Sequence, residues 1–286
     1  MRPIKVPGFE LALWAGAALL ALSASSCKKS SPAAEGEGEP ATASSSAAVT
    51  AREETPPEPE AVKDGPPPSI AARSFVFLPN FVTTRGPLNA GKAVPVRAPT
   101  APNGVVVLSC LHIFGPMGGL PEQLTASALP GAVQQAFLLD LDGKKFDIGP
   151  ALLVADAKPF EQQDASGDVS VFRAPAELAS RALELAAGLP KKGEQVWLVS
   201  SLVSGSAELM HPARVYYAAD KALSYKFDSA DLELRATSGA PVVNGKGQIV
   251  ALNLGGGNNQ GELFGFGIPV TSLRHALSEA LSAPPK

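Results

Sequence analysis

The sequence has 286 residues, of which 45% are hydrophobic and 18% are charged, and its formal net charge is −3. So small a charge argues against a nucleic-acid-binding protein, which needs a concentrated basic surface, and we expect no nucleic-acid partner. Two cysteines and three histidines exclude a disulfide scaffold and a cysteine-rich zinc site. The sequence predicts neither a metal site nor a cofactor. The hydrophobic content is too high for a chain that is disordered throughout.

The start of the chain has the pattern of a secretory signal peptide. Basic residues come first, an apolar run spans 11–22, and small residues occupy 23–26. The alternative is a transmembrane anchor, but a membrane span needs about 20 apolar residues, and Pro7 and Glu10 shorten this run. We therefore favour a cleaved signal peptide over residues 1–26.

Cys27 follows these small residues directly, and the stretch resembles the bacterial lipobox. The usual leucine of that motif stands three residues before the cysteine, where this chain has Ala24, while Leu22 lies five before it. Lys28 stands where an aspartate tends to retain such lipoproteins in the inner membrane. The resemblance implies lipidation of Cys27 and a membrane anchor through that lipid. It also implies a location in the bacterial cell envelope, at the outer membrane facing the periplasm or the cell surface.

Residues 27–70 predict a disordered tether. They are mostly Ala, Ser, Glu and Pro, with proline clusters at 56–59 and 66–68, and they show no apolar periodicity. Such a segment buries too little surface to offset its ordering entropy, and prolines favour an extended chain. We expect it to hold a folded domain over 71–286 away from a membrane.

Short apolar segments separated by Gly, Pro and Asn dominate the chain from residue 71 onward, which is typical of β-strands joined by turns. Strands are predicted at 94–96, 105–108, 137–141, 151–154, 169–172, 196–199, 213–217, 241–243, 249–254 and 263–268. Residues 139–143 and 243–247 have the pattern of hairpin turns. Many short strands favour an all-β sandwich or a pair of barrels.

Helical spacing of apolar residues occurs in two places. The segments 174–186 and 271–281 both repeat apolar side chains at intervals of three and four. Thr271 or Ser272 can cap the second helix. We expect that helix to follow the last strand.

Three polar residues stand out among the predicted strands. His112 ends an apolar strand, Asp168 opens one, and Ser238 lies in a glycine-containing turn ahead of a hairpin. Each alone has a simpler explanation, as a hydrogen-bonded structural histidine, a turn acid and a turn serine. The arrangement of all three in one chain is what raises a catalytic hypothesis.

The motifs around these residues resemble those of the trypsin-like serine peptidases, especially the bacterial envelope branch that includes the Deg/HtrA proteases. Ser109–His112 corresponds to that family's T-A-A-H, and Asp168–Val171 to D-[IL]-A-[LV]. Ala236–Pro241 corresponds to G-[DN]-S-G-G-P. Phe264–Val270 is similar to the G-F-A-I-P stretch that precedes the branch's last helix. The resemblance spans Gly91–Leu281.

The resemblance implies an all-β fold with two six-stranded antiparallel barrels. The first barrel is expected over about 71–188, the second over about 189–270, and a C-terminal helix over 271–282. The chain ends at Lys286, soon after this helix, so we expect no PDZ domain of the kind that the full Deg proteases carry.

The resemblance also implies catalytic roles in an endopeptidase that hydrolyses polypeptide substrates through an acyl-enzyme. Ser238 would be the nucleophile and His112 the base that takes its proton and returns it to the leaving amine. Asp168 would orient the imidazole and stabilise its charged form. The backbone N–H groups of Ala236 and Ser238 would form the oxyanion hole.

Substrate binding is assigned by the same resemblance. Asn253, Leu254 and Gly255 would form the edge strand that pairs with an extended peptide.

Ala236 stands where the family nearly always has glycine, and this departure keeps other functions open. One alternative is a catalytically inactive trypsin-fold lipoprotein that acts as a binding or scaffolding module. A further one is an unrelated β-sandwich lipoprotein in which the three residues meet by chance. Among the remaining candidates, His211 and His275 are expected to face solvent, and Cys110 is expected to be a buried thiol.

Overall fold

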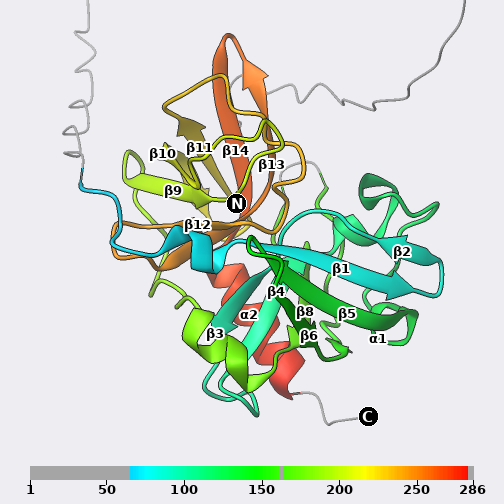
Figure 1. The fold of residues 1–286 in the computed structure, drawn as a ribbon. Coiled ribbons are helices and arrows are strands. Elements are labelled where there is room, and N and C mark those ends of the chain that lie inside the picture. Colours follow the sequence, from blue (N-terminus) through cyan, green and yellow to red (C-terminus); the bar gives the residue numbers. More distant parts are fainter. Residues whose placement is uncertain (1–64, 162–163, 283–286) are drawn as a thin grey trace, which may run out of the picture. The chain divides into compact units, whose positions relative to one another are not determined.

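The structure, a computed structural model, describes residues 65–161 and 164–282 (Figure 1). The predicted signal peptide over 1–26, the predicted lipidation at Cys27 and most of the predicted tether lie outside these described residues. In the part of the chain that the structure describes, no helix is long and apolar enough to cross a membrane.

The described elements are strands (β), α-helices (α) and short 3-10 helices (η). In chain order they are η1 (Ala72–Phe75), β1 (Phe77–Thr83), β2 (Gly86–Leu88), β3 (Val94–Arg97), β4 (Val105–Cys110), η2 (His112–Phe114), η3 (Pro116–Gly118), α1 (Leu129–Ala132), β5 (Val133–Asp140), β6 (Lys145–Ile148), β7 (Ala151–Leu152), β8 (Val169–Arg173), η4 (Ala176–Arg181), β9 (Gln195–Val199), β10 (Met210–Ala219), β11 (Ala222–Phe227), β12 (Pro241–Val243), β13 (Ile249–Asn259), β14 (Glu262–Pro269) and α2 (Val270–Ser282). Each predicted strand overlaps an observed one.

The second half of the described chain forms a closed antiparallel barrel. Its strands follow one another in space in the order β10, β11, β14, β13, β12 and β9, and Figure 1 shows them together in yellow and orange. Closure leaves no open sheet edge around most of this barrel. The barrel, the strands of the first half and the terminal helix confirm the expected all-β, trypsin-like class.

The strands of the first half form two four-stranded antiparallel sheets, in the orders β2-β1-β5-β6 and β3-β4-β8-β7. An isolated bridge between Phe77 and Ala93 joins them. Pro87 and Pro95 lie in the edge strands β2 and β3. Because proline has no N–H to donate to a neighbouring strand, it is tolerated at such edges and does not extend the sheet.

Aromatic side chains fill the space between these two sheets. Phe81 of β1 stacks on Phe172 of β8 with ring centroids 5.2 Å apart, and it also contacts Phe114 of η2 at 4.7 Å. All three rings are buried. Burial of large aromatic side chains dominates core energetics, so this cluster fixes η2 against the sheets.

Helix α2 connects the two halves of the domain. Leu273, Ala276, Leu277 and Ala280 are buried at three- and four-residue spacing, and they belong to the core that includes the first-half sheets. The helix begins at Val270, so neither Thr271 nor Ser272 caps it, and the expected cap was wrong. β14 ends at Pro269, and α2 begins at the next residue.

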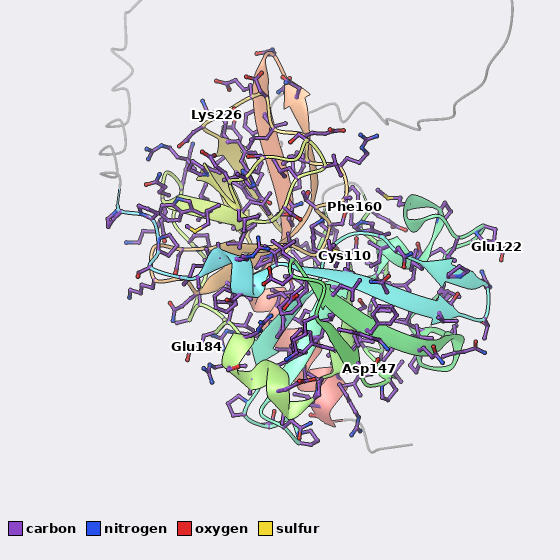
Figure 2. All side chains as sticks on the ribbon, in the orientation of Figure 1. Cys110, Glu122, Asp147, Phe160, Glu184 and Lys226 are labelled. Carbon is purple, nitrogen blue, oxygen red and sulfur yellow. The ribbon has the colours of Figure 1, made fainter. Side chains whose placement is uncertain are left out.

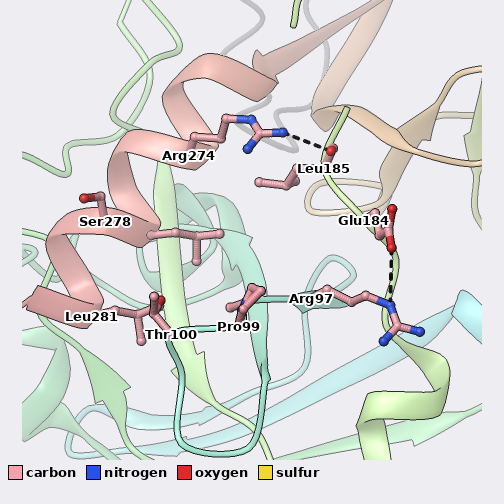
Figure 3. A pocket seen from close by; sticks show the side chains of 10 residues that line it. Arg97, Pro99, Thr100, Glu184, Leu185, Arg274, Ser278 and Leu281 are labelled. Carbon is pink, nitrogen blue, oxygen red and sulfur yellow. Dashed lines mark hydrogen bonds and ion pairs between the residues drawn. The ribbon is translucent and has the colours of Figure 1, made fainter. Parts of the chain in front are cut away.

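Arg274 adds a polar link on the other side of α2. Its guanidinium donates to the carbonyl oxygens of Leu185 at 3.0 Å and Ala186 at 2.6 Å. Figure 3 shows Arg274 above a pocket that Arg97 and Glu184 also line. The link ties the helix to the segment between the two halves.

In that connecting segment, the α-helix expected over 174–186 is not formed, so the expectation was wrong. The structure has only the 3-10 helix η4 there, after which Leu183 bridges Val96 and Leu185 bridges Ile249. The apolar positions at 183 and 185 alternate, as a strand requires, so pairing with neighbouring strands outweighed the helical spacing.

The first described residues already contact the domain. Pro68 is buried, and Ile70 packs against the core. A Cβ added at Gly247 would lie 2.5 Å from the Ile70 side chain, so the end of the range predicted as a tether lies against the turn between β12 and β13.

Candidate active site

The register of β4 and β8 brings the first two predicted catalytic residues together. Cys110, the last residue of β4, pairs with Val169, the first residue of β8. His112 therefore follows β4 at the same sheet end where Asp168 precedes β8. Both residues are buried, with 3% and 0% of their surfaces exposed.

Asp168 fixes the position and the orientation of His112. Its Oδ1 accepts the backbone N–H of His112 at 2.8 Å, and its Oδ2 lies 2.6 Å from His112 Nδ1. The backbone N–H of Phe160 donates to the same Oδ2 at 3.2 Å. Because a carboxylate only accepts hydrogen bonds, Nδ1 carries the proton and Nε2 is left as an acceptor in the neutral ring.

Ser238 completes this arrangement from the other half of the domain. Its Oγ lies 2.9 Å from His112 Nε2. The same hydroxyl is 2.8 Å from the carbonyl oxygen of Leu254, to which it can donate. A hydroxyl has one proton, so His112 and Leu254 compete for it. The structure thus brings His112, Asp168 and Ser238 into one hydrogen-bonded chain.

The turn that carries Ser238 has an unusual backbone. Ala236 has a φ of 60°, a left-handed conformation that costs a residue with a Cβ about 1–2 kcal/mol. Thr237 turns its N–H and its hydroxyl toward the carbonyl of Leu234. Among the described residues, the N–H groups of Ala236 and Ser238 donate to no acceptor. These are the two donors predicted for the oxyanion hole.

Two glycines allow close approach around this turn. A Cβ at Gly239, whose φ is 88°, would lie 2.1 Å from the Lys92 carbonyl oxygen. A Cβ at Gly91, whose φ is 70°, would lie 2.6 Å from the Ser238 carbonyl oxygen. The backbone N–H of Lys92 donates to that oxygen at 2.6 Å. Glycine is therefore required where the two halves meet at the candidate site.

Asn253 is buried and forms hydrogen bonds with the turn that carries Ser238. Its amide donates to Thr237, its Oδ1 accepts the Tyr225 hydroxyl, and its carbonyl oxygen accepts the Gly239 N–H at 2.7 Å. Cys110 Sγ lies 3.4 Å from the same carbonyl. With its groups engaged inside the protein, Asn253 is placed to support the turn, although the sequence assigned it to substrate binding.

Leu254 and Gly255, the other residues assigned to substrate binding, lie where an edge of β13 opens. β12 pairs with β13 only as far as the Pro241–Leu252 pair, and β14 covers the opposite edge through Asn259. From Leu254 onward, no described strand pairs with the β12-side edge. This edge has backbone groups available to an extended peptide.

The surroundings of Cys110 and His275 agree with the expectations from the sequence, and those of His211 do not. Cys110 is fully buried, and burial raises the pKa of its thiol well above the usual value. Figure 2 places it in the interior of the domain. The expectation that His211 faces solvent was wrong: only 1% of it is exposed, and its Nε2 lies 3.0 Å from the Ser200 carbonyl oxygen. His275 is exposed, as expected.

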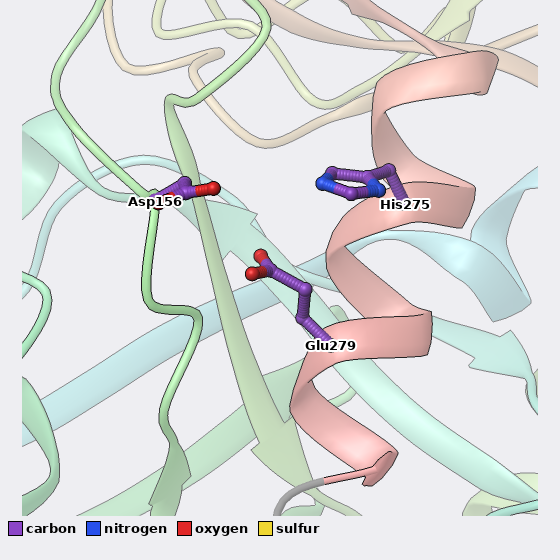
Figure 4. Close-up of side chains that lie close together, drawn as sticks. All are labelled: Asp156, His275 and Glu279. Atoms are coloured by element: carbon purple, nitrogen blue, oxygen red, sulfur yellow. The ribbon is translucent and has the colours of Figure 1, made fainter.

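One group of side chains outside the candidate active site could hold a cation. Ligand atoms of Asp156, His275 and Glu279 all lie within 4.8 Å of one another (Figure 4). Sequence reasoning missed this group. The signal was the placement of His275 and Glu279 one helical turn apart on α2, where side chains share a face. Asp156 comes from a distant loop that no sequence pattern connects to the helix.

Lys92 is a further residue that sequence reasoning missed. Only 5% of it is exposed, and its Nζ donates to the carbonyl oxygen of Ala236 at 2.9 Å. A charged residue between Gly91 and Ala93, directly ahead of an apolar strand, was the available signal.

Comparison with known proteins connects this geometry to a fold. No protein-family model matches the sequence, and no curated protein matches it either. Among solved structures, the active form of the Rv3671c protease from M. tuberculosis has a TM-score of 0.51 and 18% identity, over 76% of this chain and 85% of that chain. The likeness establishes a shared fold.

Two further solved structures match with lower scores. The inactive form of Rv3671c has a TM-score of 0.47 and 16% identity, over 74% of this chain and 91% of that one. The HtrA-type protease AlgW with tripeptide has a TM-score of 0.42 and 13% identity, over 69% of this chain and 56% of that one.

Proposed function

We propose that the protein is a serine endopeptidase of the trypsin-like type. The observation that carries the proposal is the hydrogen-bonded chain from Asp168 through His112 to Ser238. Beside it lie two backbone N–H groups for which the described part of the chain offers no acceptor. Nucleophile and base within hydrogen-bond reach, with the base oriented by a third group, is the signature of covalent catalysis by a hydroxyl.

The proposed reaction begins with attack of Ser238 Oγ on a peptide carbonyl carbon. As the O–C bond forms, His112 Nε2 takes the hydroxyl proton, and Asp168 stabilises the resulting imidazolium. The negative oxygen of the tetrahedral intermediate accepts hydrogen bonds from the N–H groups of Ala236 and Ser238. His112 then gives its proton to the leaving amine as the C–N bond breaks. Water then takes the place of the amine: its oxygen attacks the acyl carbon while His112 Nε2 takes its proton, and His112 returns that proton to Ser238 Oγ as the ester bond breaks.

The proposed substrate is a polypeptide in extended conformation. It would add to the open edge of β13 at Leu254 and Gly255, where main-chain hydrogen bonds give affinity. A substrate N–H that donates to the Leu254 carbonyl would replace the Ser238 hydroxyl there. The hydroxyl proton would then be free to turn toward His112, so binding would prepare the nucleophile.

The proposed location is the bacterial cell envelope, through a lipid on Cys27. The support is the order of basic, apolar and small residues before Cys27 in the sequence. In this proposal the Pro-rich segment that follows holds the enzyme away from the outer membrane.

A second candidate function is a non-cleaving module that binds extended peptides on the same edge. The observation that favours it is the left-handed φ of Ala236. Strain at Ala236 disfavours the turn conformation that presents the N–H groups of Ala236 and Ser238. Peptide binding at β13 does not require these N–H groups.

Peptide-bond hydrolysis is the test that separates these functions. The full chain is incubated with a casein digest, and new peptide ends are detected by mass spectrometry. We expect new ends with the wild-type chain and with Ser204→Ala, which alters an exposed serine, and none with Ser238→Ala. Hydrolysis that survives in Ser238→Ala would contradict the proposed nucleophile. A folded wild type without hydrolysis would favour the binding module.

A further inference from the structure

Lys92 is a buried cation at the candidate active site that the proposed reaction does not use. It lies in the link before β3, and its ammonium contacts the turn of the nucleophile through the Ala236 carbonyl at 2.9 Å. Within the described residues, no carboxylate forms a salt bridge with it, and that carbonyl is its side chain's only hydrogen-bond partner.

Burial of this ammonium is costly for the fold. Charged side chains are almost never fully buried unless they are paired, and burial lowers the pKa of Lys92. An apolar side chain of similar length would fill the same space without this cost. A role in packing alone therefore gives no reason for a lysine here.

The main chain of Lys92 is bound to the same turn. Its N–H donates to the Ser238 carbonyl at 2.6 Å, and its own carbonyl accepts the Ser109 hydroxyl at 2.7 Å. Lys92 thus contacts the turn at two places, Ala236 through its side chain and Ser238 through its backbone. The residue between these two contacts, Thr237, has its N–H directed away toward Leu234.

We propose that Lys92 is a positioning residue for the oxyanion hole, and this inference rests on the proposed peptidase function. Its ammonium holds the Ala236 carbonyl and thereby keeps the left-handed Ala236 in the conformation that leaves the N–H groups of Ala236 and Ser238 free. Glycine would adopt this backbone with little strain. The chain has alanine, and the contact with Lys92 offsets the preference of alanine for other conformations.

We predict that the loss of labelling rate on replacing Lys92 depends on which residue occupies position 236. Lys92→Met removes the donor and keeps a side chain of similar length, and Ala236→Gly removes the strain. The wild type, both single variants and the double variant of the full chain are labelled with a fluorophosphonate. The labelling rate is measured as a function of probe concentration. This gives the maximal rate and the probe concentration at which half of that rate is reached.

We expect Lys92→Met to lower the maximal rate by about tenfold or more, and by no more than the roughly 10²–10³-fold that loss of an oxyanion donor itself costs. The half-saturating concentration is expected to stay within about twofold. In the Ala236→Gly background, the same substitution is expected to change the rate by less than about threefold, because the variants couple through one turn. Thermal unfolding of each variant reports whether it is folded.

The possible results separate the role of Lys92 from the proposed peptidase function. An equal loss in both backgrounds, or no loss in either, would overturn the role of Lys92 while the peptidase function stands. If Lys92→Met fails to fold but the double variant folds and reacts, strain relief is supported; if neither folds, Lys92 belongs to the core and the inference is wrong. No labelling of a folded wild type or of Ala236→Gly would contradict the peptidase function itself, and with it the oxyanion role of Lys92.

Discussion

At the scale of single residues, the candidate site depends on how each polar group is directed. Asp168 accepts from two N–H groups of His112 and from the Phe160 backbone, so the carboxylate and the ring have one mutual orientation. The hydroxyl of Ser238 has two acceptors within reach. The geometry therefore constrains the base more tightly than the nucleophile.

Asp168→Asn tests the orientation of the histidine. An amide in place of Oδ2 would donate to Nδ1, which would force the ring proton onto Nε2 and remove the base from Ser238. We expect kcat on a peptide substrate to fall by about 10³–10⁴-fold with little change in KM. A loss of less than about tenfold would contradict the proposed role of the carboxylate.

Cys110 is expected to be chemically silent in the native protein. The thiol is fully buried and burial raises its pKa, whereas thiol reactivity requires an accessible thiolate. In a full chain with Cys27→Ala, Ellman's reagent at neutral pH should label no thiol before denaturation and one thiol after it. Rapid labelling of the native chain would show that the β4 strand opens.

At the scale of elements, one ion pair inside the first half and the terminal helix α2 hold the fold together. Asp140 at the end of β5 lies 2.7 Å from Arg181 of η4 and accepts the N–H groups of Asp142 and Lys144. Helix α2 packs into the core that the first-half sheets share. Both links join segments that are distant in the sequence.

Asp140→Asn should destabilise the fold in a pH-dependent way. Burial alone would raise the pKa of Asp140, but the hydrogen bond from Arg181 and the backbone N–H groups outweigh it, so the pKa lies below its usual 3.8. A carboxyl with a depressed folded-state pKa contributes stability above its unfolded pKa and loses it as pH falls through the folded value. We expect the variant to lose about 1–3 kcal/mol of unfolding free energy at neutral pH.

The loss should shrink progressively below about pH 4. Urea unfolding of both proteins between pH 7 and 2.5 measures it. An equal difference across the whole range would contradict the charged interaction.

Leu273→Ala tests the contribution of α2. Leu273 is fully buried, so the substitution removes apolar contacts and leaves a cavity in a well-packed core. We expect a loss of about 2–5 kcal/mol in unfolding free energy, measured by urea denaturation. The matched control Arg274→Ala keeps the buried face of the helix, and it should cost less because it removes the hydrogen bonds of an exposed side chain and leaves no cavity in the core.

The sequence predicted some of these elements correctly and others wrongly, and the difference has a physical reason. Apolar strands such as those predicted at 105–108 and 249–254 were found because their patterns are local. The segment 174–186 was mistaken for a helix because its leucines are spaced for either structure, and pairing with β3 and β13 decided the outcome. Lys92 and the group on α2 were missed because their partners, Ala236 and Asp156, are far away in the sequence.

At the scale of the whole molecule, the candidate site lies where the two halves of the domain meet. His112 and Asp168 come from the first-half sheets, and Ser238 comes from the barrel. The chain order of the three residues and their motifs allowed the sequence to nominate them together. Their hydrogen-bonded arrangement, the support of the turn by Asn253 and the competition for the Ser238 proton depend on the packing of the halves, which no local pattern contains.

The most direct test of the central claim is where a fluorophosphonate binds. The full chain is labelled to completion, its intact mass is measured, and the modified peptide is sequenced by mass spectrometry. We predict one adduct per chain, on Ser238, and none after denaturation or in His112→Ala, because the hydroxyl then lacks its base. An adduct on another residue, or no adduct on the folded chain, would contradict the claim that Ser238 is an activated nucleophile.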